Sequence, residues 1–220
     1  MLVYGIALHT SSPELGLALS NFAGDSRCQT WDLGQSLSTQ LHHYLAEFIQ
    51  PQIWADLAFI AVAKGPGSFT GTRIGVVTAR TLAQQLGIPL FAISTLASVV
   101  WTQHIDGEAA SEGEKISEEK SFVHAVELPA QRGQVFAAIY QVNSAGSGLI
   151  ELLPDTVMTP EVWQQTLASW PTRYHLIQVP AALGMSTYST LELAYLDWQQ
   201  GKRPDWSEAL PFYGQHPVHN

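Results

Sequence analysis

The residues of this chain that could do chemistry gather in one glycine-rich stretch, AKGPGSFTGTRIGVVTARTLAQQLG, residues 63–87. Two glycines flank a proline there, which predicts a sharp turn after a strand, because glycine adopts positive φ and proline fixes its own φ. Ser68 or Thr70 can cap the helix that follows, and the free N–H groups of a helix start suit an anion. The candidate anion-binding residues of this motif loop are Gly65, Gly67, Ser68, Thr70 and Arg73.

The stretch fails the better-known motifs that bind nucleotides or carry a nucleophile. A Walker A loop needs a lysine after its last glycine, where this chain has Thr72 after Gly71. The dinucleotide fingerprint needs a third glycine where Thr70 stands. Ser68 in GSFTG does not fit the nucleophile elbow, and spacing assigns it no Asp and His partners. We therefore predict no catalytic residue.

The histidines do not form a metal-binding pattern. His42 and His43 are adjacent, so they point to different faces of a helix and cannot bind one metal as an i, i+4 pair would. His216 and His219 flank Pro217, and no acidic neighbour completes a ligand set there. We predict no metal site.

Small residues recur every four positions through the glycine-rich stretch, which places them on one stripe of a helix. They are Gly67, Gly71, Gly75, Ala79 and Ala83. Glycine inside a helix costs about 1 kcal/mol relative to alanine, so Gly75 requires close approach of another backbone. We favour packing on the protein's own sheet, and contact with a helix of a partner chain is the alternative.

Composition limits the class of protein. The chain has 220 residues, of which 46% are hydrophobic, and a formal net charge of −9. No run of Lys or Arg could follow a phosphate backbone, so direct binding of nucleic acid is not expected. Cys28 is the single cysteine, which excludes a disulfide framework. With no basic, cleavable leader and no span of roughly 18 apolar residues, we expect a cytoplasmic protein without a membrane segment.

The elements that must position the motif follow an α/β order. Ser36 is expected to cap the first helix, residues 36–50, and Pro51 to stop it. The first half is predicted as three strands, a helix, a strand, a helix, a strand and a helix, which is the order of a ribonuclease-H-like lobe. The residues are 2–9, 15–21, 27–33, 36–50, 57–63, 70–87, 88–94 and 95–104.

The second half is predicted to repeat this outline after an acidic linker or loop at residues 105–120. Its strands are expected at 122–128, 134–142, 148–154 and 174–180, and its helices at 159–170 and 189–201. We therefore predict two domains: an N-terminal ribonuclease-H-like lobe at 1–105, and a smaller C-terminal lobe at 106–220 that begins with the acidic linker.

The block KGPGSFTGTRIGVVTARTLA, with IPLFAISTLAS behind it, resembles the signature of the TsaB (YeaZ) family. IALHTSS resembles the family's first strand and turn, AQRGQVFAAIY its second-lobe hairpin, LLPDTVMTPEVW the connection after it, and ALPFYGQHPV its C-terminal segment. The resemblance covers nearly the whole chain.

The resemblance implies a two-lobed fold of the actin, sugar-kinase and Hsp70 superfamily, each lobe with a mixed sheet and flanking helices. It implies a non-catalytic paralogue of TsaD, the enzyme that transfers the threonylcarbamoyl group to adenosine 37 of tRNA. Such a subunit binds TsaD, joins TsaE in a larger complex, is linked functionally to TsaC, contacts tRNA only indirectly and can form a homodimer. It binds no cofactor alone, although the assembled complex could hold ATP or ADP.

The resemblance places the partner interface on the helices at 36–50 and 70–87. The expected interface residues are Leu41, Leu45, Phe48, Gly71, Ile74, Gly75, Thr78 and Leu82. Helical periodicity alone does not separate outward-facing from core-facing apolar positions among them.

Departures from the family pattern favour a scaffold. Where the family usually has LDTS this chain has LHTS, so His9 replaces an Asp, and a neutral imidazole is a poor ligand for Mg²⁺. In the second-lobe hairpin, Pro129 and Gln134 stand where the family usually has acidic residues. Two alternatives stay open: an ATP-dependent small-molecule kinase of the same superfamily, which would need an acidic metal ligand near the first strand, and a metallopeptidase-like protein, for which no ligand set is visible.

Overall fold

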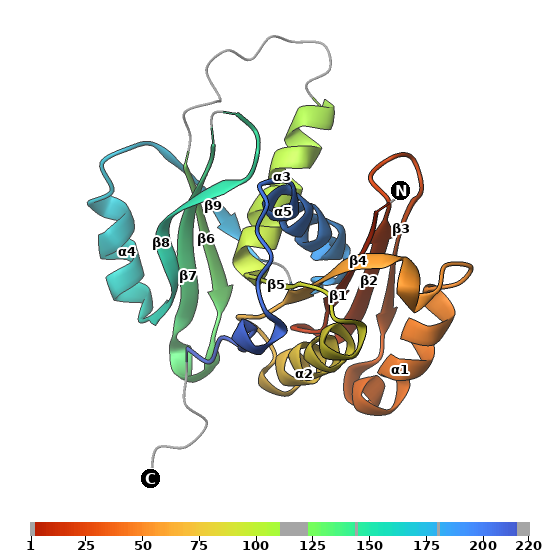
Figure 1. The fold of residues 1–220 in the computed structure, drawn as a ribbon. Helices are drawn as coiled ribbons and strands as arrows, with labels where there is room; N and C mark the ends of the chain where they lie inside the picture. The colour runs from red at the N-terminus through yellow and green to blue at the C-terminus, as the bar shows by residue number, and fades with distance from the viewer. Residues whose placement is uncertain (1–2, 111–122, 144, 180, 215–220) are drawn as a thin grey trace.

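The computed structural model describes residues 3–110, 123–143, 145–179 and 181–214. The chain forms two lobes, each built on one sheet, and the predicted two-lobed α/β fold is confirmed (Figure 1). The described residues contain no helix with the length and apolar character that crossing a membrane requires.

Sheet A, in the first lobe, has five strands in the order β3-β2-β1-β4-β5. They are β1 (Tyr4–His9), β2 (Glu14–Ser20), β3 (Ser26–Asp32), β4 (Leu57–Ala63) and β5 (Leu90–Ile93). β1, β2 and β3 are antiparallel, whereas β4 and β5 continue the sheet in parallel from β1. β1 and β4 lie in the middle and are almost wholly buried, as their continuous apolar sequences predict.

Helices cover both faces of sheet A. α1 (Leu37–Phe48) and α2 (Phe69–Leu86) lie on one face, where they complete the largest apolar core. α5 (Thr187–Gln199) covers the opposite face and packs on β1, β2 and β4. The N-terminal lobe therefore depends on a helix from the far end of the chain.

Sheet B, in the second lobe, has four strands in the order β8-β7-β6-β9. They are β6 (Val123–Pro129), β7 (Val135–Val142), β8 (Leu149–Met158) and β9 (Tyr174–Gln178). α4 (Pro160–Ala168) packs on one face through Trp163 and Leu167, and α3 (Thr95–Ala110) packs on the other. Thr159 caps α4 by accepting the N–H of Val162 at 3.4 Å.

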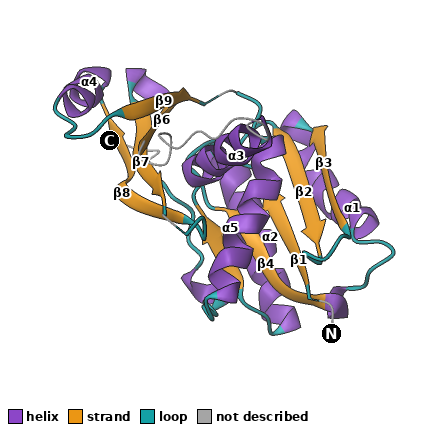
Figure 2. Cartoon of the chain, turned by 90° about the horizontal axis from the view of Figure 1, so that it is seen from above, coloured by secondary structure: helices purple, strands orange, loops and turns teal. Residues whose placement is uncertain are grey.

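The two lobes share their helices across the interface. α3 follows the last strand of sheet A yet packs on sheet B, and α5 follows sheet B yet packs on sheet A, so the two helices lie together between the sheets (Figure 2). Hydroxyl pairs join them: Ser98 with Thr190 at 2.8 Å, and Thr102 with Ser189 at 2.8 Å. The strands of sheet A all precede those of sheet B, so the boundary between the two sheets lies between β5 and β6. The helices do not follow a lobe boundary at residue 105, because α3 packs on sheet B.

Two local predictions require correction. Residues 105–110, expected in the acidic linker, continue α3, because Ile105 still packs against the core of the second lobe. The rest of the predicted linker, residues 111–120, lies outside the described residues, as do His216 and His219. Ser36 accepts no capping hydrogen bond, because a 3₁₀ turn at Gly34–Ser36 leads directly into α1.

Candidate functional site

The glycine-rich loop connects β4 to α2 and is fastened to the turn after β1. Ser68 is the N-cap of α2 and accepts the N–H of Gly71 at 3.2 Å, as the sequence predicts. Its own N–H donates to the carbonyl of Ser11 at 2.7 Å. Thr72 donates from its hydroxyl to the Ser11 hydroxyl at 3.1 Å. These contacts hold the start of α2 directly against the β1–β2 turn.

The small-residue stripe exists because this turn lies under α2. A Cβ added to Gly67 would collide with the Ser11 carbonyl, one added to Gly71 with the Thr10 carbonyl, and one added to Gly75 with the Thr10 hydroxyl. That hydroxyl donates to the carbonyl of Gly71 at 2.8 Å. The stripe therefore packs on the protein's own chain, the interpretation that the sequence favours.

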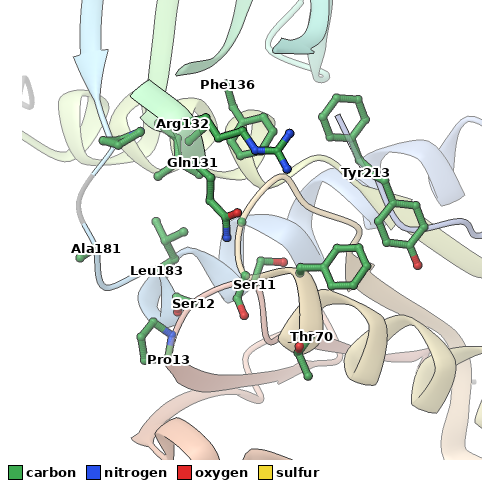
Figure 3. Close-up of a pocket in the computed structure, with 17 residues that line it drawn as sticks. Ser11, Ser12, Pro13, Thr70, Gln131, Arg132, Phe136, Ala181, Leu183 and Tyr213 are labelled. Carbon is green, nitrogen blue, oxygen red and sulfur yellow. The ribbon is translucent and has the colours of Figure 1, made fainter. Parts of the chain in front are cut away.

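A pocket of about 510 Å³ opens between the lobes at this point (Figure 3). Its floor comes from Ser11 and Ser12 of the β1–β2 turn and from the start of α2 at Ser68 and Thr70. Its roof is the β6–β7 hairpin, from which Gln131 points down toward the serines. Its apolar sides come from four aromatic residues, Phe69, Phe136, Phe212 and Tyr213, and from Leu128 and Leu183.

Arg132 is the cation of this pocket and was not among the predicted site residues. It occupies the tip of the β6–β7 hairpin with φ of 58°, a left-handed conformation uncommon for a residue with a side chain. The turn makes this conformation necessary, because Ala130 and Gln134 close the hairpin with a backbone hydrogen bond of 2.8 Å. The sequence signal was the short RG turn between two strands, which predicts a hairpin but not that its tip reaches the other lobe.

The lining of the pocket has features that suit the binding of an anion. The first-turn N–H groups of α2 and the guanidinium of Arg132 provide positive electrostatic character, which suits an anion. Within the described part of the chain, no Asp, Glu, His or Cys lines the pocket. A Mg²⁺-nucleotide is held by carboxylate ligands, which the lining lacks, and the titratable groups of the lining are the Tyr213 phenol and Arg132.

His9, which ends β1, does not compensate for the missing carboxylate. Its side chain is fully buried, and neither ring nitrogen has a hydrogen-bond partner among the described residues. Burial lowers the pKa of His9 to about 4, so the imidazole is neutral at physiological pH. The end of β1 therefore presents an uncharged, buried ring.

The predicted anion-binding residues divide between the pocket and its surroundings. Gly67, Ser68 and Thr70 line it. Gly65 lies behind it with φ of 96°, where an added Cβ would approach the Phe212 carbonyl at 3.3 Å. Arg73 is exposed on α2, outside the lining, with its guanidinium 5.4 Å from the ring centre of Phe69.

Most of the predicted interface residues do not form a surface. Leu41, Leu45 and Phe48 belong to the core between α1, α2 and sheet A, with exposed fractions of 0%, 2% and 7%. Their placement on a partner-facing surface is therefore wrong: the apolar stripe of α1 is the face that α1 needs for its own packing. Gly71, Gly75 and Thr78 are also buried, whereas Ile74 and Leu82 are partly buried against the same core.

An internal carboxylate links the lobes near this site. Asp155 of β8 accepts hydrogen bonds from the Ser94 hydroxyl, which caps α3, at 2.9 Å and from the Tyr140 hydroxyl at 3.0 Å. Burial raises the pKa of Asp155, against the lowering effect of both hydrogen bonds and of Lys64. Burial, with the carboxylate beside it, also raises the pKa of Tyr140.

The architecture defines the class of protein. Two sheets that exchange helices across an interlobe pocket make this chain a two-lobed α/β protein. YeaZ from Pseudomonas aeruginosa, a solved structure, superposes with a TM-score of 0.73 at 21% identity and covers 96% of this chain and 100% of its own. A structure described as an uncharacterized protein with similarity to peptidase YEAZ, from the same organism, gives 0.74 at 20% identity, covering 97% and 100%. At these identities the similarity shows the fold alone.

Sequence comparisons show which proteins this chain is similar to. The family model for TsaD, tRNA N6-adenosine threonylcarbamoyltransferase, matches residues 46–113. The tRNA threonylcarbamoyladenosine biosynthesis protein TsaB of Bacillus subtilis is 38% identical over 51% of this chain and 42% of its own. TsaB of Escherichia coli is 31% identical over 53% of this chain and 47% of its own. The chain thus spans about half the length of these curated relatives, and its resemblance to the TsaB (YeaZ) family is confirmed.

Proposed function

We propose that this chain is a non-catalytic subunit that binds a TsaD-type transferase and supports threonylcarbamoyl transfer to adenosine 37 of tRNA. The observation that carries the proposal is the lining of the interlobe pocket. The described residues place no Asp, Glu, His or Cys there, and His9 is buried and neutral at the end of β1. A pocket of this composition suits binding and offers no carboxylate or imidazole for metal-assisted or acid–base chemistry.

The comparisons support the pathway. Two curated relatives carry the name of threonylcarbamoyladenosine biosynthesis, and the matching family model is that of the transferase itself. The matched residues 46–113 include all of α2 and all of α3, and with them the glycine-rich loop. A chain that is similar to the transferase in this region, yet has no Asp, Glu, His or Cys among the described residues that line its pocket, fits the role of a paired subunit.

The partner surface that we propose is the outward stripe of α2. Phe69, Arg73, Val77 and Thr81 follow one another at i, i+4 spacing, and all are exposed. Val77 is 59% exposed and Phe69 36%. This stripe takes the place of the buried residues first expected there, and its apolar members are the ones that a partner helix would cover.

The test is binding between this chain and the TsaD-type transferase of the same organism. Light scattering on a size-exclusion column should show a heterodimer for the wild type and separate proteins for Val77→Glu, because the substitution puts a charge into an apolar contact. Val162→Glu is the matched control, since Val162 is a 49% exposed helical valine on α4 of the other lobe. It should bind like the wild type.

Two outcomes would refute parts of the proposal. Wild-type proteins that stay separate with and without ATP would remove the partner, and equal binding by Val77→Glu would move the contact away from α2. A titration that showed Mg²⁺-dependent turnover of ATP by this chain alone would instead support the kinase alternative.

We further propose the wider setting that the resemblance implies. The heterodimer joins TsaE in a cytoplasmic complex that receives its activated substrate from TsaC. In this complex tRNA contacts this chain only indirectly, through the transferase, and the assembled complex binds ATP or ADP. A homodimer through the same α2 stripe would compete with the heterodimer. Adding the transferase to a homodimeric preparation should then convert it to heterodimer.

A further inference from the structure

The edge of sheet A at β5 is bracketed by the C-terminal segment but not covered by it. The N–H of Leu90 donates to the Pro204 carbonyl at 3.3 Å, and the N–H of Phe212 donates to the Lys64 carbonyl at 2.7 Å. Between these points the segment turns away at the 3₁₀ turn Trp206–Glu208, which packs on the α2 side of the lobe (Figure 1). The middle of β5 therefore has no strand beside it.

Backbone groups are exposed at this uncovered edge. Pro89 and Ile93 turn their carbonyls toward β4, where they accept from Ile60 at 3.0 Å and from Lys64 at 2.8 Å. Because backbone groups alternate along a parallel strand, the carbonyl of Leu90 and both groups of Ala92 point to the free edge. Within the described ranges, the backbone groups of Ala92 have no partner on that side.

A groove of about 620 Å³ lies along this edge. The strand residues Leu90–Ile93 form one wall, and Leu210, which is 62% exposed, contributes apolar surface from the C-terminal segment. An edge strand with free donors and acceptors in a groove is the arrangement to which extended peptides add.

Basic residues stand at both ends of the groove. Lys64 lies beside Ile93 at one end of the groove, and Arg203 precedes Pro204, which contacts Leu90 at the other end. The three residue steps of β5 from Leu90 to Ile93, at roughly 3.3 Å each, separate the two ends by about 10 Å. Arg203 is fixed in place: its guanidinium stacks 4.3 Å from the ring centre of Trp198 and donates to that residue's carbonyl at 2.7 Å.

Among the described residues that line the groove, basic side chains outnumber acidic ones by one. Lys202 is paired with Asp197 at 2.6 Å. Glu208 adds one acidic group, and Lys64 also attracts Asp155 from the lobe interface. Three basic residues against two acidic ones line the groove, on a chain whose formal net charge is −9. The groove is therefore a place on this acidic protein where an acidic ligand is attracted.

We propose that this groove binds an extended peptide segment of a partner protein with carboxylates about three to four residues apart. The peptide pairs with Ala92 and Leu90 as an added strand, and its carboxylates lie against Lys64 and Arg203. None of the described residues that line the groove belongs to α2, so the inference does not depend on the proposed function.

The probe is the fluorescein-labelled peptide Glu-Val-Thr-Val-Glu with blocked ends, followed by fluorescence anisotropy against the full chain. We expect saturable binding that weakens at least tenfold for Lys64→Ala and for Arg203→Ala, and weakens with added salt. Arg173→Ala, which removes an exposed cation outside the groove, should bind like the wild type.

A second peptide tests the backbone pairing without changing the protein. The same sequence with N-methylated valines keeps both carboxylates and loses the N–H groups that strand addition needs, so it should bind at least tenfold more weakly. Equal binding of both peptides would overturn the proposal in favour of charge attraction alone. Absence of saturable peptide binding would overturn the proposal. Concentration-dependent dimerisation of the chain that Lys64→Ala abolishes would also overturn it, because a second copy of the chain would then occupy the groove.

Discussion

Replacing His9 by leucine should remove a pH-dependent part of the protein's stability. The imidazole is fully buried without a hydrogen-bond partner in the described structure, and its pKa is lowered from 6.5 to about 4. Between these values the unfolded chain binds a proton that the folded chain does not. The contribution of His9 is therefore complete above pH 6.5 and is lost as pH falls toward 4.

The magnitude follows from the size of the shift. A lowering of about 2.5 pKa units corresponds to roughly 3 kcal/mol, and most of it, about 2.5 kcal/mol, should be lost by pH 4.5. His9→Leu replaces the ring by an apolar side chain of similar size, so it should also relieve the cost of two buried nitrogens without partners. We expect the variant to be at least as stable as the wild type at pH 8 and to gain on it progressively toward acid.

Urea unfolding followed by tryptophan fluorescence, at a series of pH values from 8 to 4.5, measures both free energies. The difference between variant and wild type cancels the contributions of the other titrating groups. His42→Leu, at an exposed position of α1, controls for the loss of an imidazole from the chain. If the difference between His9→Leu and wild type stayed constant across the series, the reasoning about His9 would be refuted, and a partner for the imidazole, such as an internal water, would have to be sought.

Three further substitutions test the packing around the site. Leu45→Glu should lower the free energy of unfolding by more than about 4 kcal/mol and so unfold the protein, because it puts a charge into the core. A native far-UV circular dichroism spectrum with unchanged stability in urea would contradict the burial of the Leu45 side chain. Asp155→Asn should keep the two hydrogen bonds that this side chain accepts and should match or exceed wild-type stability at pH 7. Because the raised pKa of Asp155 makes the wild type less stable as pH rises, the free energy of unfolding of Asp155→Asn should fall less over the same pH range. Asp155→Ala, which loses both hydrogen bonds, should cost about 1–3 kcal/mol in chemical unfolding. Gly75→Ala should destabilise the protein, despite the helix propensity of alanine, because the added Cβ collides with the Thr10 hydroxyl. In a double-mutant cycle, Thr10→Ala should restore at least about 1 kcal/mol of the stability that Gly75→Ala loses. If the effects of the two substitutions were additive, the Thr10 hydroxyl would not be the cause of the loss.

The order of elements could be predicted from the sequence because each carries its own local signal. The buried strand at β4 is a continuous apolar run, and α2 follows a glycine-proline turn with a serine N-cap. What could not be predicted is which helix covers which sheet. The exchange of α3 and α5 depends on non-local packing, for which a 3.6-residue period gives a buried face but no partner.

The same limit explains the errors at the interface. An apolar stripe on α1 is equally consistent with a core and with a partner surface, and in the structure Leu41 and Leu45 fill the core of their own lobe. Arg132 could not be found because its role depends on two hairpins meeting across the lobes, far apart in the sequence. Gly67, Ser68 and Thr70 were found because loop and helix start are neighbours in the chain.

The glycine-rich loop shows why a motif of this kind is a poor guide to chemistry by itself. Its glycines are each explained by the β1–β2 turn: Thr10 and Ser11 lie where a Cβ of Gly67, Gly71 or Gly75 would have to be. Because α2 packs closely on that turn, its first residues lie at the floor of the pocket. The geometry suited to an anion is therefore a consequence of packing, and a side chain able to do chemistry must come from elsewhere. At the end of β1 the ring of His9 is buried and uncharged, so His9 does not supply such a side chain.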